Sequence, residues 1–229
     1  MKTRRNCFSK SNGNFAGIHY TTEHTAKMYG LVSLSTDINS NPICTGRRKI
    51  AGSICSVCFS ADMWDDNTGQ YRKGNKAFKT NTQILCGRLL TDNEIPVINP
   101  EKWPLFRFEA FADLQNITQV LNYFKIARKN PRTKFALWTK NPGFIARAVE
   151  LVPVPKNLQI ILSSMGINKP ARGERFPFVD KVFTVYDDDT IKRDGVEINC
   201  GARSCMGCKL CYKPNPAGVA LVQVRERVK

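Results

Sequence analysis

Seven of the nine cysteines in this chain fall into two groups near opposite ends of the sequence. The first group is Cys44, Cys55 and Cys58, and the second is Cys200, Cys205, Cys208 and Cys211. Thiolates at two-residue intervals bind zinc or iron-sulfur clusters, and spacing alone separates these poorly. The pattern therefore predicts cysteine-ligated metal, either at two sites or at one joint site that ties the ends of the chain together.

The second group favours a 4Fe-4S cluster over zinc. Its last three cysteines are separated by two-residue gaps, which let a wound loop direct several thiolates at one cubane. Gly201 and Gly207 permit the tight backbone that such a loop needs. Zinc sites more often use paired Cys-x2-Cys knuckles joined by a longer loop. Zinc remains the alternative to the cluster at these cysteines.

The first group offers only three thiolates. Either a fourth ligand comes from elsewhere or one iron of a cluster is left open. An open iron can bind a substrate or cofactor, just as a catalytic zinc keeps one non-protein position. The alternative is that Cys55 and Cys58 join two C-terminal cysteines in a single structural site. The spacing therefore allows either one cluster or two.

Other polar residues give weaker signals. Cys86 and Cys7 lack a partner at ligand spacing, so we expect Cys86 to be a buried small hydrophobe and Cys7 to be incidental. His19 and His24 are expected to be surface or hydrogen-bonded histidines rather than metal ligands. The acidic run 187–189 is typical of a solvated turn more than of a magnesium site.

Composition indicates one globular domain over residues 1–229, because 42% hydrophobic content is ordinary for a core of this length. No apolar run is long enough for a membrane span, and the basic N-terminus is not followed by one, so we expect no signal peptide and no membrane contact. A cytoplasm is the expected location. Thiols stay reduced in a cytoplasm, which favours metal ligation over disulfides.

The formal net charge of +16 favours a polyanionic partner, and nucleic acid is the obvious one. The basic residues are spread along the chain without a long tract, so solvated surface charge is the alternative. Contacts to phosphates would make binding salt-dependent and largely indifferent to base sequence.

Hydrophobic periodicity predicts an alternation of strands and helices. We expect strands over residues 30–35, 104–110, 134–139, 158–163, 181–186 and 219–224, and helices over 75–90, 114–129 and 144–151. Apolar strands separated by helices indicate a parallel sheet. The predicted fold class is α/β, a partial TIM-barrel-like parallel sheet with flanking helices and cysteine-rich loops at both ends. Residues 1–29 form a basic N-terminal extension, and 187–216 form the C-terminal cysteine-rich segment.

Four charged residues beside the predicted strands are candidate catalytic groups: Arg107, Glu109, Asp113 and Lys140. Charge on a buried strand is costly unless it is paired or functional. Alternating positions share a strand face, so Arg107 and Glu109 could line the mouth of a barrel together. The alternative is an Arg-Glu ion pair, with Asp113 capping a helix that begins near Leu114.

Several motifs resemble a bacteriophage family called gene product eighty-eight. They are the run 44–59 (CTGRRKIAGSICSVCF), the segments 107–113 (RFEAFAD) and 135–140 (FALWTK), and the closing cysteines 200–211 followed by Tyr212. Thr45 stands where the family often has proline and Phe59 where it often has tyrosine, and neither change removes a thiolate. The resemblance implies a phage source more than an activity, and with it a location in the cytoplasm of an infected bacterial host.

The layout is more distantly similar to radical S-adenosylmethionine enzymes, whose partial barrel carries a cysteine loop after its first strand. Their Cys-x3-Cys-x2-Cys motif is absent here, and only Cys55-x2-Cys58 matches its last half, with Cys44 as the third candidate ligand. The resemblance implies S-adenosylmethionine as a possible cofactor.

Together these features predict a phage-encoded iron-sulfur protein with redox or radical chemistry at the barrel mouth. The alternative is a zinc-stabilised nucleic-acid-binding protein with structural cysteine sites. A structural cluster without catalysis is a third hypothesis.

Overall fold

The computed structural model describes residues 8–10, 17–22, 24, 26–65, 67, 69, 75–201 and 204–228. Cys7 and much of the basic N-terminal segment lie outside this part of the chain. The strands are β1 (Phe8–Lys10), β2 (His19–Thr21), β3 (Val32–Leu34), β4 (Leu105–Phe108), β5 (Lys134–Thr139), β6 (Leu158–Ser163), β7 (Lys181–Tyr186) and β8 (Val222–Arg227).

The helices alternate with these strands over most of the chain. The α-helices are α1 (Pro42–Arg48), α2 (Phe59–Met63), α3 (Asn75–Gly87), α4 (Ile117–Lys129), α5 (Pro142–Val149), α6 (Asp188–Asp194) and α7 (Cys205–Cys208). Short 3-10 helices are η1 (Ala26–Met28), η2 (Ile54–Val57), η4 (Gly173–Arg175) and η5 (Leu210–Tyr212). None of the described helices is long and apolar enough to cross a membrane.

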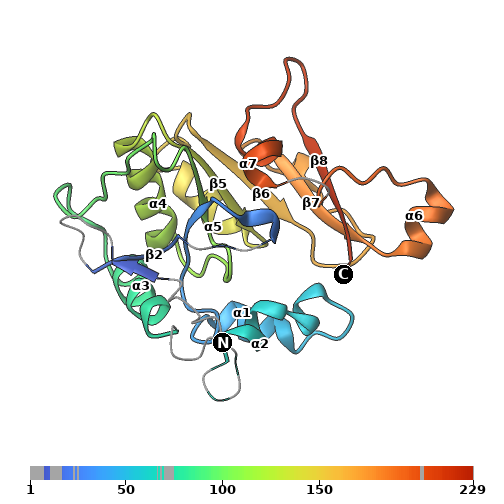
Figure 1. The fold of residues 1–229 in the computed structure, drawn as a ribbon, viewed down its shortest axis with the longest axis horizontal. Helices are drawn as coiled ribbons and strands as arrows, with labels where there is room; N and C mark the ends of the chain where they lie inside the picture. The colour runs from blue at the N-terminus through green and yellow to red at the C-terminus, as the bar shows by residue number, and fades with distance from the viewer. Residues whose placement is uncertain are drawn as a thin grey trace, which may run out of the picture.

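The strands form one sheet in chain order, from β1 at one edge to β8 at the other (Figure 1). The pairs from β3 to β8 are all parallel, whereas β1, β2 and β3 pair antiparallel. The parallel α/β sheet is thus confirmed. The sheet is open, however, because its edge strands β1 and β8 pair with different neighbours and do not close it into a barrel.

The strong apolar periods located the central elements well, since β5, β6 and β7 have the predicted bounds. The segment 36–52 has no long apolar period, but it contains α1, whose start is fixed by Asn41 and Pro42. The Asn41 side chain accepts from the backbone N–H groups of Ile43 and Cys44 at 3.0 and 3.2 Å. A side-chain cap followed by proline at the first turn starts a helix without any long apolar period.

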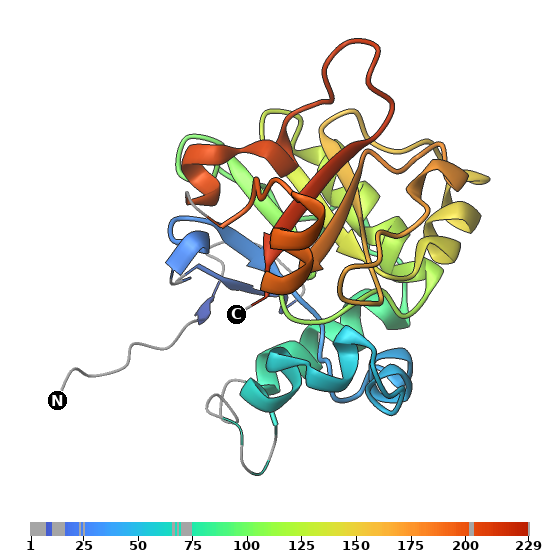
Figure 2. The same cartoon turned by 90° about the vertical axis from the view of Figure 1, so that its right-hand side faces the viewer.

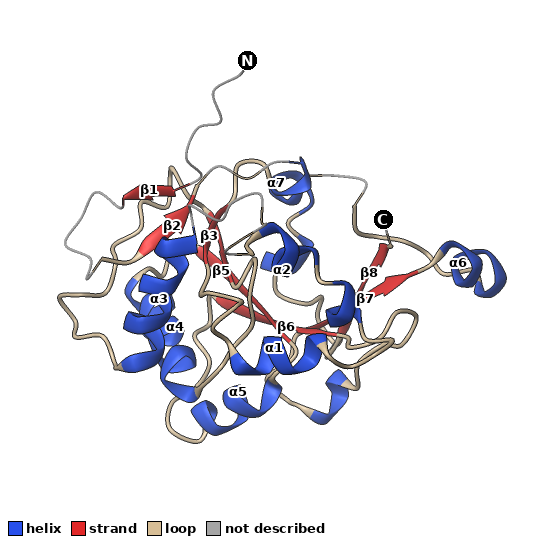
Figure 3. Cartoon of the chain, turned by 90° about the horizontal axis from the view of Figure 1, so that it is seen from below, coloured by secondary structure: helices blue, strands red, loops and turns tan. Residues whose placement is uncertain are grey.

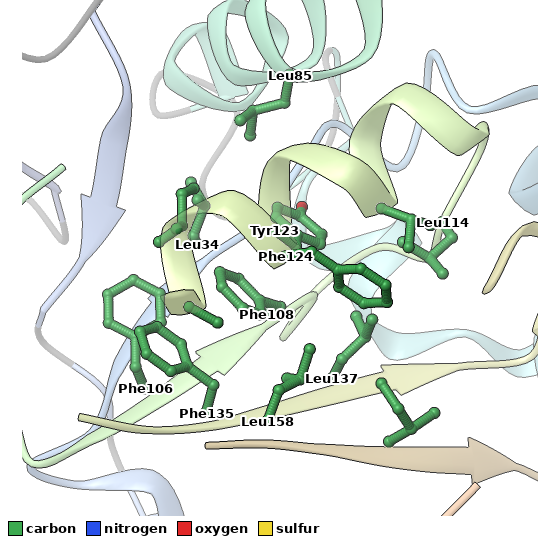
Figure 4. Close-up of a cluster of buried hydrophobic side chains, with 14 of the residues drawn as sticks. Leu34, Leu85, Phe106, Phe108, Leu114, Tyr123, Phe124, Phe135, Leu137 and Leu158 are labelled. Carbon is green, nitrogen blue, oxygen red and sulfur yellow. The ribbon is translucent and has the colours of Figure 1, made fainter. Parts of the chain in front are cut away.

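One face of the sheet packs against α3, α4 and α5 (Figure 3). Phe106, Phe108 and Phe135 project from the strands into this layer and are fully buried (Figure 4). Phe108 stacks on Tyr123 of α4 with ring centroids 4.3 Å apart, and Phe135 stacks on Phe108 at 5.1 Å. Such stacked pairs add about 0.5–1.5 kcal/mol each beyond area burial.

The other face is covered by the C-terminal cysteine segment. Leu105, Ala136 and Ile161 are buried there against Tyr212 of η5, with Cys211 packed at the margin. A parallel sheet must bury both faces, and no long helix covers this one. The segment that carries the second cysteine group therefore supplies part of the core.

Lys181 anchors this segment from inside the protein. It is 1% exposed, and its ammonium donates to Gln159 Oε1, the Lys213 carbonyl and Asn215 Oδ1 at 3.0, 2.9 and 2.7 Å. Burial lowers the pKa of Lys181, and the charge of Asp180 opposes that effect. The three acceptors use all three protons of the ammonium.

We predict that Lys181→Met lowers the free energy of unfolding by about 1–3 kcal/mol, because it leaves buried acceptors without a donor. Hydrogen exchange should also speed up around Asn215, where two of the three acceptors lie. Denaturant titration measures the first effect. Lys156→Met, at an exposed position, is the matched control. Equal stability of the two variants would contradict this role.

Candidate functional site

The first cysteine group lies beyond the carboxyl end of β3. Cys44 is on α1, Cys55 is in η2 and Cys58 is the residue before α2. Cys44 and Cys58 pack against one apolar cluster that includes Trp64 and Phe111. A negative charge on Cys58 raises the pKa of both Cys44 and Cys55. Cys44 and Cys58 therefore lie beside one apolar cluster, and Cys58 acts electrostatically on Cys55 as well.

Asp113 fixes this group to the sheet. Its carboxylate accepts from the Thr139 hydroxyl at 2.6 Å and the Lys140 N–H at 2.9 Å, and it pairs with Arg47 of α1 at 3.5 Å. Its backbone carbonyl accepts from the side chain of Asn41, the residue that caps α1. One residue thus joins α1 to the carboxyl ends of β4 and β5.

The alternative role for Asp113, a helix cap, is wrong. α4 begins at Ile117, and its cap is Asn116, whose side chain accepts from the Gln119 N–H at 2.9 Å. Asp113 does accept from its neighbour Leu114, but that contact precedes the helix.

Burial has the largest effect on the pKa values of Cys44 and Cys55 in the first group. It raises the pKa of Cys44, and the charges of Asp113 and Glu109 raise it further. Burial also raises the pKa of Cys55, while the charge of Lys140 lowers it. A thiol binds metal as the thiolate, so metal uptake here would release protons, with Lys140 favouring the charged form.

Glu109 lies beneath this group, in an unusual backbone conformation. Its φ is +53°, in the left-handed region, and the residue is 2% exposed. Its carboxylate accepts from Gln119 at 2.7 Å, from the Thr36 hydroxyl at 3.0 Å and from the Tyr123 hydroxyl. Burial raises the pKa of Glu109 to about 7, and these hydrogen bonds limit the rise. Strain of this kind concentrates at functional sites.

Arg107 points to the opposite face from Glu109, so the expected shared face is wrong. The left-handed turn at Glu109 breaks the alternation that follows β4, and the Glu109 carboxylate accepts from Gln119 and Tyr123 of α4. Arg107 instead stacks on Trp138, with its guanidinium carbon 4.0 Å from the ring centroid. Neither residue forms the Arg-Glu ion pair that was the alternative.

The second cysteine group lines one pocket on the Arg107 face. Cys200, Cys205, Cys208 and Cys211 all border a cavity of about 280 Å³. The backbone of Cys200 pairs with β8, α7 carries Cys205 and Cys208, and η5 carries Cys211. The Ser204 side chain caps α7, and Lys209 ends it with φ at +58°. That left-handed residue turns the chain so that Cys211 returns to the same cavity.

Two lysines, Lys27 and Lys209, line this pocket together with the acidic Glu197. Lys27 borders it and is ion-paired with Glu226 of β8. Burial raises the pKa of Cys205, whereas the charges of Arg107 and Lys27 lower it. Burial raises the pKa of Cys211 to about 12, although Arg107 lowers it. The cations therefore favour negative charge on these sulfurs.

The two groups occupy different parts of the molecule. α1 and α2 lie at the lower end in Figures 1 and 2, and α7 lies toward the upper part. The single site that joins Cys55 and Cys58 to the C-terminal cysteines is therefore not formed. Within the described residues, no three His, Cys, Asp or Glu side chains converge closely enough to hold one metal ion.

The remaining polar residues are engaged in the fold. Cys86 is half-buried rather than buried, and its sulfur accepts from Gln115 at 2.9 Å. His24 is hydrogen-bonded to Ser33 at 3.0 Å. Asp187 caps α6 by accepting from the Thr190 N–H at 2.8 Å, so the acidic run starts a helix instead of a solvated turn.

Sequence reasoning missed Arg47, Lys27 and Trp138 as parts of the two sites. Arg47 sits one helical turn after Cys44, a spacing that would have indicated it once α1 was recognised. Lys27 and Trp138 reach the second group only through tertiary contacts.

We predict that Glu109 makes stability depend on pH. Its folded pKa of about 7 exceeds its ordinary value of 4.5, so the folded state binds the proton more tightly. The free energy of unfolding should therefore fall by up to about 3 kcal/mol as pH rises from about 4.5 to about 7. Glu109→Gln should remove this decline.

Urea titrations across that pH range measure the effect, and Glu101→Gln at an exposed position is the control. If the pH profile of Glu109→Gln parallels that of the wild type, the carboxyl does not titrate as described.

The family match covers most of the chain: the family model described as Gene product 88 matches residues 7–225. No curated protein and no solved structure shows a significant match. The comparisons add no support for the more distant resemblance to radical S-adenosylmethionine enzymes. The matched range includes both cysteine groups.

Proposed function

The chain belongs to the Gene product 88 family, and we propose that it is an iron-sulfur protein that holds a 4Fe-4S cluster at each cysteine group. The observation that carries the proposal is the pocket of about 280 Å³ bordered by Cys200, Cys205, Cys208 and Cys211. Four thiolates are the usual complete ligand set of such a cluster.

The arrangement of the second group suits a cluster better than one zinc ion. Zn–S bonds of about 2.3 Å place four sulfurs about 3.8 Å apart around one centre. A cubane is larger, so its ligands must stand around a cavity, as these four cysteines do. Arg107 and Lys27 would offset the negative charge of a thiolate-bound cluster.

The first group supports a different role, because three thiols offer three ligands and leave one iron without a protein thiolate. The group lies at the carboxyl ends of the parallel strands, where open α/β sheets bind ligands. A bound cluster would supply electron transfer or substrate binding there. A narrower form of this proposal is that the sheet acts as a partial barrel and that the open iron binds S-adenosylmethionine.

The charged residues take separate roles in this proposal. Lys140 is the cation nearest to a substrate at the first group, since its charge reaches both Cys44 and Cys55. Asp113 positions α1 and the Lys140 backbone. Glu109 can hold a proton beneath the group. Arg107 belongs to the second group, where it sets charge rather than binding substrate.

Iron and sulfide analysis tests the proposal on anaerobically purified chain. We expect a brown protein with about eight iron and eight sulfide per chain, which loses about half of each in Cys55→Ser and in Cys208→Ser. Cys86→Ser is the matched control, because its thiol lies in neither group, and it should keep the full count. Colourless protein with stoichiometric zinc would contradict the proposal and support zinc-stabilised sites.

The S-adenosylmethionine form has its own test. Reduced protein incubated with S-adenosylmethionine should release 5′-deoxyadenosine if this form holds. No release by iron-replete protein would remove this form and leave the cluster proposal intact.

We predict that Arg107→Met lowers the reduction potential of the second cluster. Reduction adds negative charge, and removing a nearby cation makes that less favourable, by on the order of 100 mV. The measurement uses Cys55→Ser as background, so that only the second cluster remains. Arg128→Met, on the exposed surface of α4, is the control. A potential that moves equally in both variants would contradict the local role of Arg107.

The net charge of +16 supports a second candidate function, nucleic-acid binding in the cytoplasm of an infected host. Fluorescence anisotropy with a labelled oligonucleotide tests it, and affinity should fall steeply with salt. Affinity that does not change with salt would contradict phosphate contacts.

A further inference from the structure

A second pocket lies beside the first cysteine group, between α1 and α5. Its volume is about 370 Å³, and it is a shallow hollow that is largely open to solvent. The residues that matter to its chemistry are Arg47 of α1, Lys140 at the end of β5, and Gly143 and Arg147 of α5. Figure 3 shows α1 and α5 next to each other at this place.

The lining is cationic, with Arg47, Lys140 and Arg147 on three elements and no acidic residue among them. Arg47 is already held, because it donates to the Lys140 carbonyl at 3.1 Å and pairs with Asp113. Within the described part of the chain, the Lys140 ammonium and the Arg147 guanidinium have no carboxylate partner. Three cations facing one hollow raise the local concentration of anions.

The start of α5 adds donors to the same pocket. Asn141 precedes the helix but makes no side-chain cap, because its amide donates to the Leu114 carbonyl at 2.7 Å. Pro142 fills the first helical position and Gly143 follows it in the pocket wall. The N–H groups of a first turn lack partners within the helix, and the helix dipole makes this end positive. A phosphate group uses both features.

The pocket and the cysteine group share a wall. Ile43 lines the pocket and the next residue is Cys44. Lys140 lines the pocket and its charge also lowers the pKa of Cys55 against the effect of burial. An anion held here would thus lie next to the three thiols.

We propose that this pocket binds the phosphate or diphosphate group of a small-molecule substrate. The phosphate lies at the start of α5 between Lys140 and Arg147, and the rest of the molecule extends toward Cys44, Cys55 and Cys58. The proposal names the substrate class for the function proposed above. Its catalytic meaning rests on that function, whereas the binding itself does not require a cluster.

Inorganic pyrophosphate is the probe. Calorimetric titration of the wild-type chain at low ionic strength should show one saturable site. Lys140→Gln and Arg147→Gln should each weaken binding about tenfold or more, because each removes a charge-assisted contact to phosphate. Lys192→Gln removes the same charge from the exposed face of α6 and should leave the affinity unchanged. Non-saturable binding, or equal weakening by all three variants, would contradict the proposal that this pocket binds phosphate.

Two further arms separate the remaining outcomes. Cys55→Ser should keep its pyrophosphate affinity, because the proposed site does not require a cluster. A wild-type chain that binds pyrophosphate but no iron would contradict the cluster proposal and still support the phosphate site. Loss of binding in folded Cys55→Ser would place the anion on the cluster and overturn the proposal. An oligonucleotide of about 12 nucleotides should not compete with pyrophosphate. Competition in the wild-type chain, together with weaker oligonucleotide binding by Lys140→Gln and Arg147→Gln, would instead assign the pocket to nucleic acid.

Discussion

The need to bury both faces of a parallel sheet organises this protein. Helices α3, α4 and α5 cover one face, with Phe106, Phe108 and Phe135 beneath them. The other face would expose Leu105, Ala136 and Ile161 if the C-terminal segment did not lie on it. Because that segment carries four cysteines, the same packing that completes the core also gathers a thiol-lined pocket. The packing of this segment therefore both completes the core and places the four thiols around one pocket.

Buried charge is the second constraint, and each case is compensated differently. Lys181 is surrounded by three oxygen acceptors, and Asp113 by a hydroxyl, an N–H and Arg47. Arg107 stacks on Trp138 and lies near thiols, which compensate it fully only when they are ionised. Glu109 has several donors but also a strained backbone. Arg107 and Glu109 are thus less fully compensated than Lys181, and each lies near a cysteine group.

Two sites of different character result from this arrangement. The C-terminal group is half-buried and lies on its own loop, α7 and η5, with cations nearby. The N-terminal group stands at the carboxyl end of the sheet beside a cationic pocket. The N-terminal group thus lies beside a cationic hollow, and the C-terminal group borders a pocket of its own.

The sequence by itself determined the parallel strands and the membership of each cysteine group. These features are local: apolar runs such as 134–139 and 158–163 mark buried strands, and ligand spacing is read along the chain. Tertiary structure decided that the sheet stays open, that the two groups stay apart, and that Arg107 and Glu109 face opposite sides. A single left-handed residue reverses a side chain without any local signal, since its cost is repaid by contacts to Thr36, Gln119 and Tyr123 from elsewhere in the chain.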